Sequence, residues 1–482
     1  MKLKFLYLIF FISILGCISG SPIRYRELKG GYPKTDWEAR NAEASKILSD
    51  LLKINTVRGN EGQAVQYLQK IFAKEGIPTR TIVPPNQPNR PNLIAELKAT
   101  IPNPLPGIVL VNHLDTVEFD AKEWGEPPTS GLIKDGRIYG RGAIDMKGMA
   151  VMELMAILEI KRSGVPRSRN IMFLSLADEE SGSVFGGQFI TKNHAKEFQG
   201  YEYAINEGGV ASRDIVIPGS TIFNIQYAEK GNLWIRAKAT DLGGHGSTPP
   251  KDYAAIKLMN FFRDVREWDN GIRITDETEA FFYQLGTISN FPNSFFLKNA
   301  GNPFIKPLLS GTIRSNRHLT AMTTNTKSVT GLMTTEGDKG ENVIASTAYG
   351  KLDLRLLPGT DPDKVFAQLK EIAAPYNIEL TVTDSNPADS TPIDTPLFQT
   401  MASVAKSKFE KSTVTPFLSP GKTDSSYMRR IGIKCYGLIP AVLKAEDIDT
   451  MHGKNENISV ENLKLGSQIL TEVLWESNAQ DQ

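Results

Sequence analysis

Residues Ile108 to Gly148 read IVLVNHLDTVEFDAKEWGEPPTSGLIKDGRIYGRGAIDMKG. The apolar run that opens this stretch predicts a buried strand. His113 and Asp115 follow directly, at the end of the strand where open α/β sheets bind their ligands. A Gly-rich turn then leads to Asp145, and apolar residues at helical spacing follow it, which predicts Asp145 at a helix N-terminus. One histidine and one aspartate on adjacent loops are more often a polar contact than a site, so other segments must supply further ligands.

Acidic side chains follow two more predicted strands. The apolar segment 170–177 leads to Glu179 and Glu180, and the segment 201–206 leads to Glu207. Strands that alternate with helices in this way predict a mostly parallel α/β sheet. The candidate ligands are the acidic residues and histidines that follow strand ends, together with one histidine in a late loop. They are His113, Asp145, Glu179, Glu180, Glu207 and His452.

These side chains indicate a metal centre. Carboxylates that converge on one cleft repel one another and cannot all be ionised. Two divalent cations would remove this repulsion, and nitrogen and oxygen ligands without a thiolate suit Zn(II). Co(II) and Mn(II) accept the same ligands and are the alternatives to zinc.

The pattern of strands and helices changes after residue 225. An alternating, antiparallel type of strand is predicted over 232–239, 326–333 and 346–356, with a helix over 253–268. We therefore predict a fold in two parts. A mostly parallel α/β catalytic domain is expected over 39–225 and 355–482, with an inserted α+β domain over 226–354.

The N-terminus predicts export. Residues 1–17, MKLKFLYLIFFISILGC, combine a basic start with an apolar core too short to span a membrane comfortably, which is typical of a signal peptide. The segment ends in Leu-Gly-Cys17 and resembles a bacterial lipobox, so we predict lipidation of Cys17; cleavage by a general signal peptidase is the alternative. Residues 18–38 are polar and are predicted to form a tether. The expected location is the bacterial cell envelope, on the outer membrane or the periplasmic face, with a lipid anchor as the only membrane contact.

Composition excludes some partners. The 482 residues include 55 basic and 54 acidic ones, for a net charge of +1, so no bulk attraction to nucleic acid is expected. After processing at Cys17 only Cys435 would remain, and no intramolecular disulfide could form. Cys435 stands in an apolar run and is expected to be a packing residue.

Several ordered motifs together resemble a known family. They are His113-Leu-Asp115-Thr-Val, Gly140-Arg-Gly-x-x-Asp145-Met-Lys-Gly, Asp178-Glu-Glu-x-Gly182, Gly244-His-Gly-Ser-x-Pro249 and Gly421-Lys-Thr-Asp-Ser425, followed by His452. The sequence is similar to the di-zinc exopeptidase family of aminoacylases and carboxypeptidases. Within it, the branch of carboxypeptidase S and the N-acyl-amino-acid hydrolases is the most similar. The resemblance implies that the inserted domain is ferredoxin-like and serves as a lid and dimerisation domain.

The resemblance also implies how the metals are held. Asp145 would bridge two Zn(II) ions. His113 and Glu207 would hold one ion, and Glu180 and His452 the other.

Further roles follow from the same resemblance. Asp115 would orient the ring of His113. Glu179 would be the general base that takes a proton from the attacking water and passes it to the leaving amine. His245 would reach the active site of a second subunit and stabilise the oxyanion there, which implies a homodimer formed through the inserted domain.

The substrate contacts are inferred in the same way. Arg355 matches an arginine that binds the substrate carboxylate, for which the planar guanidinium is well suited. Asn342 matches a position near the substrate carbonyl, and Gly421 and Thr423 match a turn that holds a carboxylate. Lys422 departs from the family pattern, which usually has glycine there, and is expected to alter the substrate pocket.

The leading hypothesis is therefore an amidohydrolase. Its substrate would be a peptide or an N-acyl amino acid whose amine half carries a free carboxylate. The alternative is a catalytically inactive relative that works as an envelope binding or receptor domain. Such a relative would be recognised by the loss of a ligand or of the base, and here every one of those positions is filled.

Overall fold

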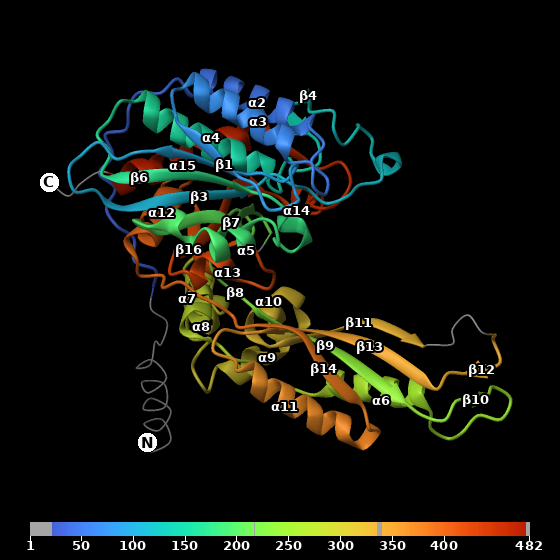
Figure 1. The fold of residues 1–482 in the computed structure, drawn as a ribbon. Helices are drawn as coiled ribbons and strands as arrows, with labels where there is room; N and C mark the ends of the chain where they lie inside the picture. The colour runs from blue at the N-terminus through green and yellow to red at the C-terminus, as the bar shows by residue number, and fades with distance from the viewer. Residues whose placement is uncertain (1–21, 216, 335–339, 479–482) are drawn as a thin grey trace, which may run out of the picture.

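The computed structural model describes residues 22–215, 217–334 and 340–478, and two large sheets organise them (Figure 1). The larger sheet has the strand order β1-β2-β6-β3-β7-β16-β8-β15. In this order the strands are β1 (Thr79–Ile82), β2 (Asn92–Leu97), β6 (Arg169–Leu176), β3 (Leu105–His113), β7 (Tyr201–Arg213), β16 (Lys434–Leu443), β8 (Thr221–Glu229) and β15 (Ser412–Ser419). The pairs β6–β3, β3–β7, β7–β16 and β8–β15 are parallel. The predicted mostly parallel sheet is confirmed.

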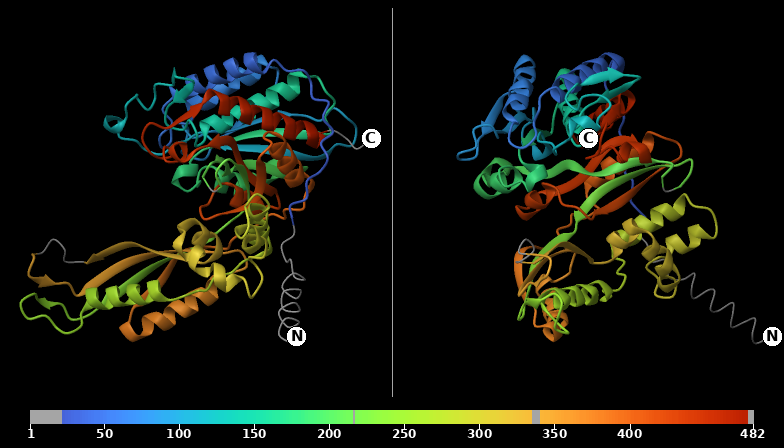
Figure 2. Two further views of the ribbon diagram at one scale, coloured as in Figure 1. Left: turned by 180° about the vertical axis from the view of Figure 1, so that it is seen from behind. Right: turned by 90° about the vertical axis from the view of Figure 1, so that its right-hand side faces the viewer.

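Helices cover both faces of this sheet (Figure 2). One face carries α2 (Trp37–Leu52), α3 (Gly62–Lys74), α4 (Lys147–Arg162), α12 (Pro396–Ser407) and α15 (Val460–Asn478), and the other carries α5 (Gly187–Asn193) and α13 (Ser425–Arg430). In β3, Ile108 and Leu110 pack in the first core, while Val109 and Val111 pack in the second. A central strand buried on both faces has no polar alternation, which explains the apolar run before His113.

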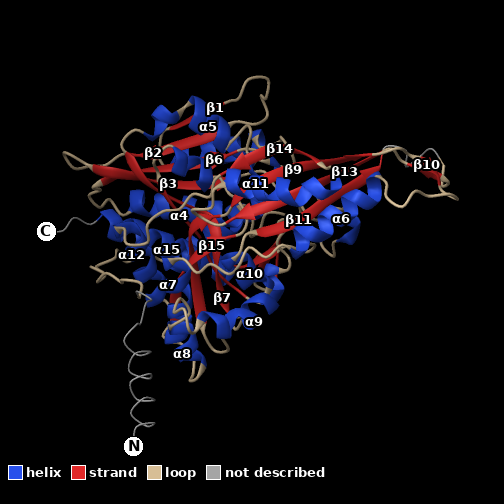
Figure 3. Cartoon of the chain, turned by 90° about the horizontal axis from the view of Figure 1, so that it is seen from below, coloured by secondary structure: helices blue, strands red, loops and turns tan. Residues whose placement is uncertain are grey.

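The inserted domain is built on the second sheet, which is antiparallel with the order β11-β13-β9-β14 (Figure 3). Its elements in chain order are β9 (Gly231–Thr240), α6 (Ala254–Glu267), β11 (Thr326–Thr334), β13 (Thr347–Leu356), α11 (Pro362–Ala373) and β14 (Glu379–Asn386). Both helices bury their apolar faces in one core against this sheet. The succession βαββαβ is the ferredoxin-like motif, as predicted.

The domain boundary predicted at residues 354 and 355 was wrong. Strand β14 pairs with β9 along most of its length, and α11 buries Val365 and Leu369 in the core of the inserted domain. The chain therefore returns to the main body only after Asn386. An amphipathic helix followed by a strand fits either domain, and only the pairing partner of the strand decides between them.

Part of the predicted insertion belongs to the edge of the main sheet. Residues 276–323 form α7 (Asp276–Thr287), α8 (Asn293–Lys298), α9 (Lys306–Ser315) and α10 (Arg317–Thr323). Phe281 and Phe282 of α7 pack in one cluster with Ile222 of β8 and Phe417 of β15. These helices cover the β15 edge of the larger sheet, so the span 226–354 is not one compact unit.

A small third sheet brings two distant loops together. It has the order β17-β5-β4 and consists of β4 (Leu132–Lys134), β5 (Arg137–Tyr139) and β17 (Asn457–Ser459). Asn457 pairs with Tyr139. Because β5 ends just before the Gly-rich turn and β17 begins just after His452, this pairing places Asp145 and His452 on the same side of the molecule.

The segment predicted as a tether is held against the main body over its described residues. Ile23 is 7% exposed and lies in the main core. The backbone N–H groups of Lys29 and Gly30 each donate to the carboxylate of Glu476 on α15, both at 3.0 Å. Residues 22–36 form no helix or strand, but these contacts contradict a free tether. Among the described residues, none of the helices has the length and apolar character needed to cross a bilayer.

Candidate metal centre and active site

Three of the five predicted ligands lie at or near the carboxyl ends of main-sheet strands, and the other two lie in loops that reach the same place. His113 is the last residue of β3, and Glu207 lies in β7 beyond its pairing with β3. Glu180 lies in η2 (Glu179–Ser181), the single turn that follows β6. Asp145 precedes α4 through a cis peptide bond to Met146. His452 lies in the turn after α14 (Ala445–Ile448).

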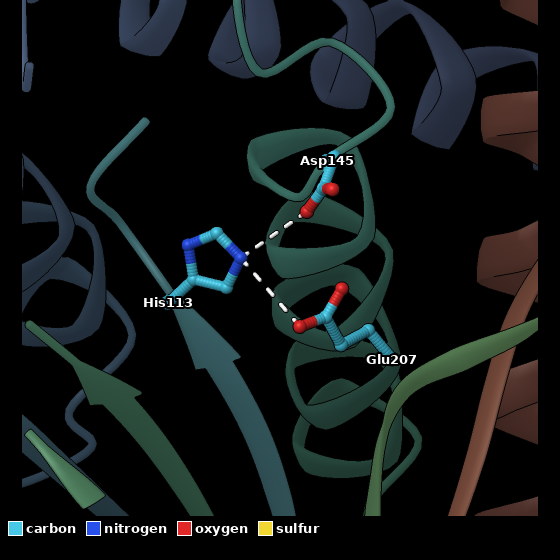
Figure 4. A group of neighbouring side chains, drawn as sticks. All are labelled: His113, Asp145 and Glu207. Atoms are coloured by element: carbon cyan, nitrogen blue, oxygen red, sulfur yellow. Dashed lines mark hydrogen bonds and ion pairs between the residues drawn. The ribbon is translucent and has the colours of Figure 1, made fainter. Parts of the chain in front are cut away.

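These residues form two groups that share one carboxylate. In the first, Nε2 of His113 lies 3.2 Å from Oδ1 of Asp145 and 3.7 Å from Oε1 of Glu207 (Figure 4). In the second, Nε2 of His452 lies 3.0 Å from Oδ2 of Asp145 and 3.1 Å from Oε1 of Glu180. Within each group the nitrogen and oxygen atoms lie within 4.8 Å of one another. The two oxygens of Asp145 thus face two different histidines, which is the arrangement that two neighbouring cations need.

Asp115 contacts both His113 and the turn that carries Glu179 and Glu180. Its backbone carbonyl oxygen lies 3.0 Å and its Oδ1 3.4 Å from Nδ1 of His113, whose Nε2 therefore faces Asp145. Its carboxylate accepts the backbone N–H groups of Glu179 and Glu180, both at 3.1 Å. Asp115 is 2% exposed. One buried residue therefore fixes a ring from β3 and the turn after β6 relative to each other.

The electrostatics of the groups fit cations. Burial and the neighbouring carboxylates raise the pKa of Glu179 and of Glu207 well above the usual range. Burial disfavours the charged form of His113, but the neighbouring carboxylates outweigh it and raise its pKa. Hydrogen bonds to Asp145 and Glu180 raise the pKa of His452 to about 10. The site thus takes up protons to balance its excess of negative charge, and divalent cations would supply the same balance.

A cavity of about 520 Å³ opens beside the two groups, between the main body and the inserted domain. Glu179 lines it, and this side chain belongs to neither group. Arg355, Gly421 and Thr423, which were predicted to contact substrate, line the same cavity. Four predicted residues from distant segments therefore share one space.

Two of the cavity residues are held by buried or aromatic partners. Arg355 Nε donates to Oδ1 of Asp353 at 2.9 Å, and its guanidinium lies 5.9 Å from the ring centroid of Trp234. The backbone N–H of Thr423 donates to the buried carboxylate of Glu229 at 3.1 Å. Both positions are thus presented to the cavity in a defined orientation.

The geometry agrees with a comparison of the sequence with protein families. The profile of peptidase family M20/M25/M40 matches residues 109–476, a span that contains both groups and the cavity residues. The chain belongs to this family. It is a hydrolase of the M20 peptidase and aminoacylase type, and the resemblance inferred from its motifs is confirmed.

Individual M20 proteins resemble the chain over most of its length. N-fatty-acyl-amino acid synthase/hydrolase PM20D1 of Homo sapiens is 28% identical over 376 residues, which are 76% of this chain and 73% of that protein. Probable carboxypeptidase S-like 2 of Dictyostelium discoideum is 25% identical over 363 residues, or 74% of this chain and 69% of that protein. The structure of the M20 family metallo-carboxypeptidase Sso-CP2 from Sulfolobus solfataricus superimposes with a TM-score of 0.67 at 23% identity, covering 90% of this chain and 98% of that one.

His245 and Asn342 lie apart from the two groups. His245 lies in β10 (Gly244–His245) and Asn342 directly precedes β12 (Val343–Ile344). These two short strands pair at the end of the inserted domain that is remote from the main sheet (Figure 1). Nδ2 of Asn342 lies 3.2 Å from Nε2 of His245, and both residues are exposed. The structure therefore brings this predicted pair together, but not to the metal centre of its own M20 chain.

Sequence reasoning missed several buried residues that hold the site. Arg141 and Glu456 form an ion pair of 2.8 Å beneath Asp145. Asp424 accepts a hydrogen bond from Ser183 in the turn that carries Glu179, and burial raises the pKa of Asp424 to about 7. A signal for Asp424 was present, since it stands inside the Gly421–Ser425 motif. Glu456 is an isolated acid in a loop, and nothing in its sequence context distinguishes it.

Of the two cysteines, the structure describes only Cys435. Cys435 is a free, buried thiol whose pKa burial raises to about 12, which agrees with the predicted packing role. Cys17, the predicted lipidation site, lies outside the described residues.

Proposed function

We propose that this M20 hydrolase is a zinc-dependent amidohydrolase that cleaves an amide bond next to an amino acid with a free carboxylate. One observation carries the proposal. Two candidate ligand groups share Asp145, and Glu179, which adjoins the candidate ligand Glu180, lines a cavity that Arg355 also lines. Candidate metal ligands, a carboxylate outside both groups and a guanidinium therefore lie in neighbouring positions.

The metal ligands of the proposal are the residues of the two groups. His113 and Glu207 would hold one ion, Glu180 and His452 the other, and Asp145 would bridge them. Donor chemistry supports zinc, because the donors are imidazole nitrogens and carboxylate oxygens without a thiolate. When bound, such ions polarise a carbonyl oxygen and acidify water.

Glu179 is the proposed general base. It adjoins the ligand Glu180 but belongs to neither group, and it lines the cavity. Its carboxylate takes a proton from the attacking water and delivers it to the nitrogen of the departing amine.

Arg355, Gly421 and Thr423 are the proposed receptor of the substrate carboxylate. A guanidinium can hold both carboxylate oxygens at once. Arg355 has further N–H groups besides the two that donate to Asp353. All three residues line the same cavity, which supports this role.

A second copy of the chain would complete the site. His245 and Asn342 are exposed residues at the paired strands β10 and β12, remote from the candidate metal centre of their own chain (Figure 1). In a homodimer formed through the inserted domain, this pair would enter the cavity of the partner, where His245 would stabilise the developing oxyanion.

The names of the relatives support two substrate types. One relative is an N-fatty-acyl-amino acid synthase/hydrolase and another a probable carboxypeptidase. Hydrolysis of N-acetyl, N-long-chain-acyl and dipeptide substrates, each with chelator and with added zinc, tests the proposal. Turnover that chelation abolishes and zinc restores is expected. Absence of turnover on every compound with zinc present would refute the proposed reaction.

Export and a lipid anchor at Cys17 are also proposed, on the signal-like segment alone. In a bacterial host, metabolic labelling with palmitate should mark the wild-type chain and not a Cys17→Ala variant. An unlabelled wild-type chain that is nevertheless shortened at its N-terminus would instead indicate a general signal peptidase.

A further inference from the structure

The cavity beside Glu179 carries positive charge on two opposite walls. Arg355 and Trp234 belong to the inserted domain, whereas Lys422 and Arg430 belong to the main body, at and just before α13. The substrate carboxylate proposed above uses Arg355 from one wall and Gly421 and Thr423 from the other. The two cationic side chains of the main-body wall, Lys422 and Arg430, have no role in that function.

Lys422 and Arg430 converge on one tyrosine. Nζ of Lys422 lies 3.0 Å from the hydroxyl of Tyr427 and 4.3 Å from its ring centroid. The guanidinium carbon of Arg430 lies 5.6 Å from the same centroid. Tyr427 is held in turn by Gln188, whose Nε2 donates to the hydroxyl at 3.0 Å. Two cations are therefore fixed around one aromatic ring by contacts that do not depend on a ligand.

No carboxylate within the described part of the chain lies at ion-pair distance from Lys422. Arg430 meets Asp389 at 3.5 Å. Across the cavity, Asp384 already accepts the side-chain amides of Asn232 at 2.7 Å and Asn386 at 2.9 Å. An ammonium group in this position is incompletely compensated, and an anion from a ligand would satisfy it.

The pKa of the Lys422 ammonium reflects these surroundings. Burial lowers the pKa of its ammonium and the charge of Arg430 lowers it further, while the more distant carboxylates of Asp384, Glu229 and Asp424 raise it only in part. A carboxylate placed between the two cations would relieve their repulsion and gain charge-assisted hydrogen bonds.

We propose that Lys422 and Arg430 form a second anion subsite, so that the preferred substrate carries a second carboxylate besides the one that Arg355 receives. This inference rests on the proposed function. The second carboxylate can belong to the side chain of the amino acid, as in an N-acyl glutamate, or to the acyl group, as in an N-succinyl amino acid. Lys422 is then the residue that determines specificity, at a position where glycine would leave the wall neutral.

Matched pairs of substrates test the subsite. The first pair is N-acetyl-glutamate and N-acetyl-glutamine, and the second is N-succinyl-leucine and its neutral succinamide analogue. The ratio of kcat/KM for acid over amide should be about 10- to 100-fold in one pair, and that pair identifies the source of the carboxylate. In Lys422→Met the ratio should fall to about one, and Lys422→Arg should restore part of it. Lys411→Met removes an exposed lysine from another surface and should keep the wild-type ratio.

Ratios near one in both pairs, or a ratio that Lys422→Met leaves intact, would overturn the subsite. Calorimetric titration of the same compounds into the Glu179→Gln variant gives a readout without turnover. If the wild type hydrolyses none of the compounds, the proposed function fails, while tighter binding of the acid than of the amide, lost in Lys422→Met, would still support the subsite. Equal binding of acid and amide would refute it.

Discussion

Arg141 and Glu456 form a buried ion pair that joins the two segments carrying Asp145 and His452. Nη1 of Arg141 lies 2.8 Å from Oε2 of Glu456, and their side chains are 4% and 0% exposed. The carboxylate also accepts the backbone N–H groups of Gly142, Ile144 and Asp145, at 2.9, 2.8 and 3.1 Å. Arg141 donates in turn to the carbonyl oxygens of His452 at 3.3 Å and Gly453 at 2.8 Å. One ion pair thus fixes the segment of Asp145, the carboxylate that the two candidate groups share, relative to the segment of His452.

Removal of Glu456 should destabilise the whole protein. Glu456→Ala leaves a buried guanidinium and three backbone donors without partners, and we expect a loss of about 3–5 kcal/mol in the free energy of unfolding. Chemical denaturation measures this loss. The control is Glu461→Ala, whose side chain is 78% exposed and whose effect should be small. A loss below about 1 kcal/mol in Glu456→Ala would contradict the anchoring role.

Asp115→Asn should weaken metal binding without unfolding the chain. The amide keeps one oxygen for a backbone N–H, but its NH₂ group faces the other N–H and can no longer accept a hydrogen bond. We expect zinc affinity or kcat/KM to fall by about 10- to 100-fold. Competition with a chelator of known affinity measures the first quantity. Asp135→Asn, at an exposed turn, is the matched control, and equal affinities in the two variants would exclude the orienting role of Asp115.

Glu179 and Glu180 are adjacent but should respond to mutation in different ways. Glu179→Gln should bind metal normally and lose turnover by about 10²- to 10⁴-fold, because a general base is removed. Glu180→Gln should lose metal, since the Glu180 carboxylate lies 3.1 Å from His452 in the second group. Metal content by atomic spectroscopy, measured beside kcat on the same samples, separates the two effects. Glu179→Gln protein with reduced metal content, or with near-normal turnover, would argue against the assignment.

The contrast between what the sequence predicted and what it missed has a physical basis. His113 and Glu207 were predicted because each follows an apolar strand, and the ends of parallel strands meet at one edge of a sheet. Asp145 was predicted because it directly precedes an apolar pattern with helical spacing. Glu456 was missed because its partners are Arg141, which is distant in the sequence, and backbone N–H groups, which leave no signal in the sequence. Lys422 was noticed only as a departure from a family motif, and its neighbours in space could not be inferred.

In the fold, too, some features were predicted from the sequence and one was not. The helix over 253–268 and the strands of the inserted domain follow from periodicity, and α6, β9, β11 and β13 agree with the predicted ranges within one or two residues. The end of the insertion was misplaced because β14 pairs with β9, more than a hundred positions earlier in the chain. The local sequence pattern indicates that a segment is a strand, but it does not indicate which other strand pairs with that segment.

Lys230 should make stability depend on pH. It is 2% exposed, lies between β8 and β9, and donates to the carbonyl oxygens of Thr324 at 2.8 Å and Ala321 at 3.1 Å. Burial, followed by the charge of Arg355, lowers its pKa from 10.5 to about 7. Between these values the unfolded chain keeps a proton that the folded chain releases, so this group makes the free energy of unfolding rise with pH, by up to about 1.4 kcal/mol per pH unit.

The Lys230→Met variant lacks this contribution. Its free energy of unfolding relative to wild type should therefore decline steadily as the pH is raised from 7 to about 10. Denaturation at a series of pH values gives the difference directly, and Lys364→Met, whose side chain in the wild type is 84% exposed, should show a constant difference. Parallel curves for wild type and Lys230→Met would show that Lys230 titrates alike in both states.

Mixed dimers test whether His245 acts on a partner subunit. Glu179→Gln and His245→Ala should each be nearly inactive as homodimers. When the two chains are co-expressed, one of the two sites in each mixed dimer combines an intact Glu179 with a partner's intact His245. Random pairing then gives about a quarter of the wild-type activity, whereas a histidine that served its own chain would give only the sum of the two parents. Activity at that lower level in a preparation shown to contain mixed dimers would therefore place His245 outside the partner's site, and the exposed β10–β12 pair would need another explanation.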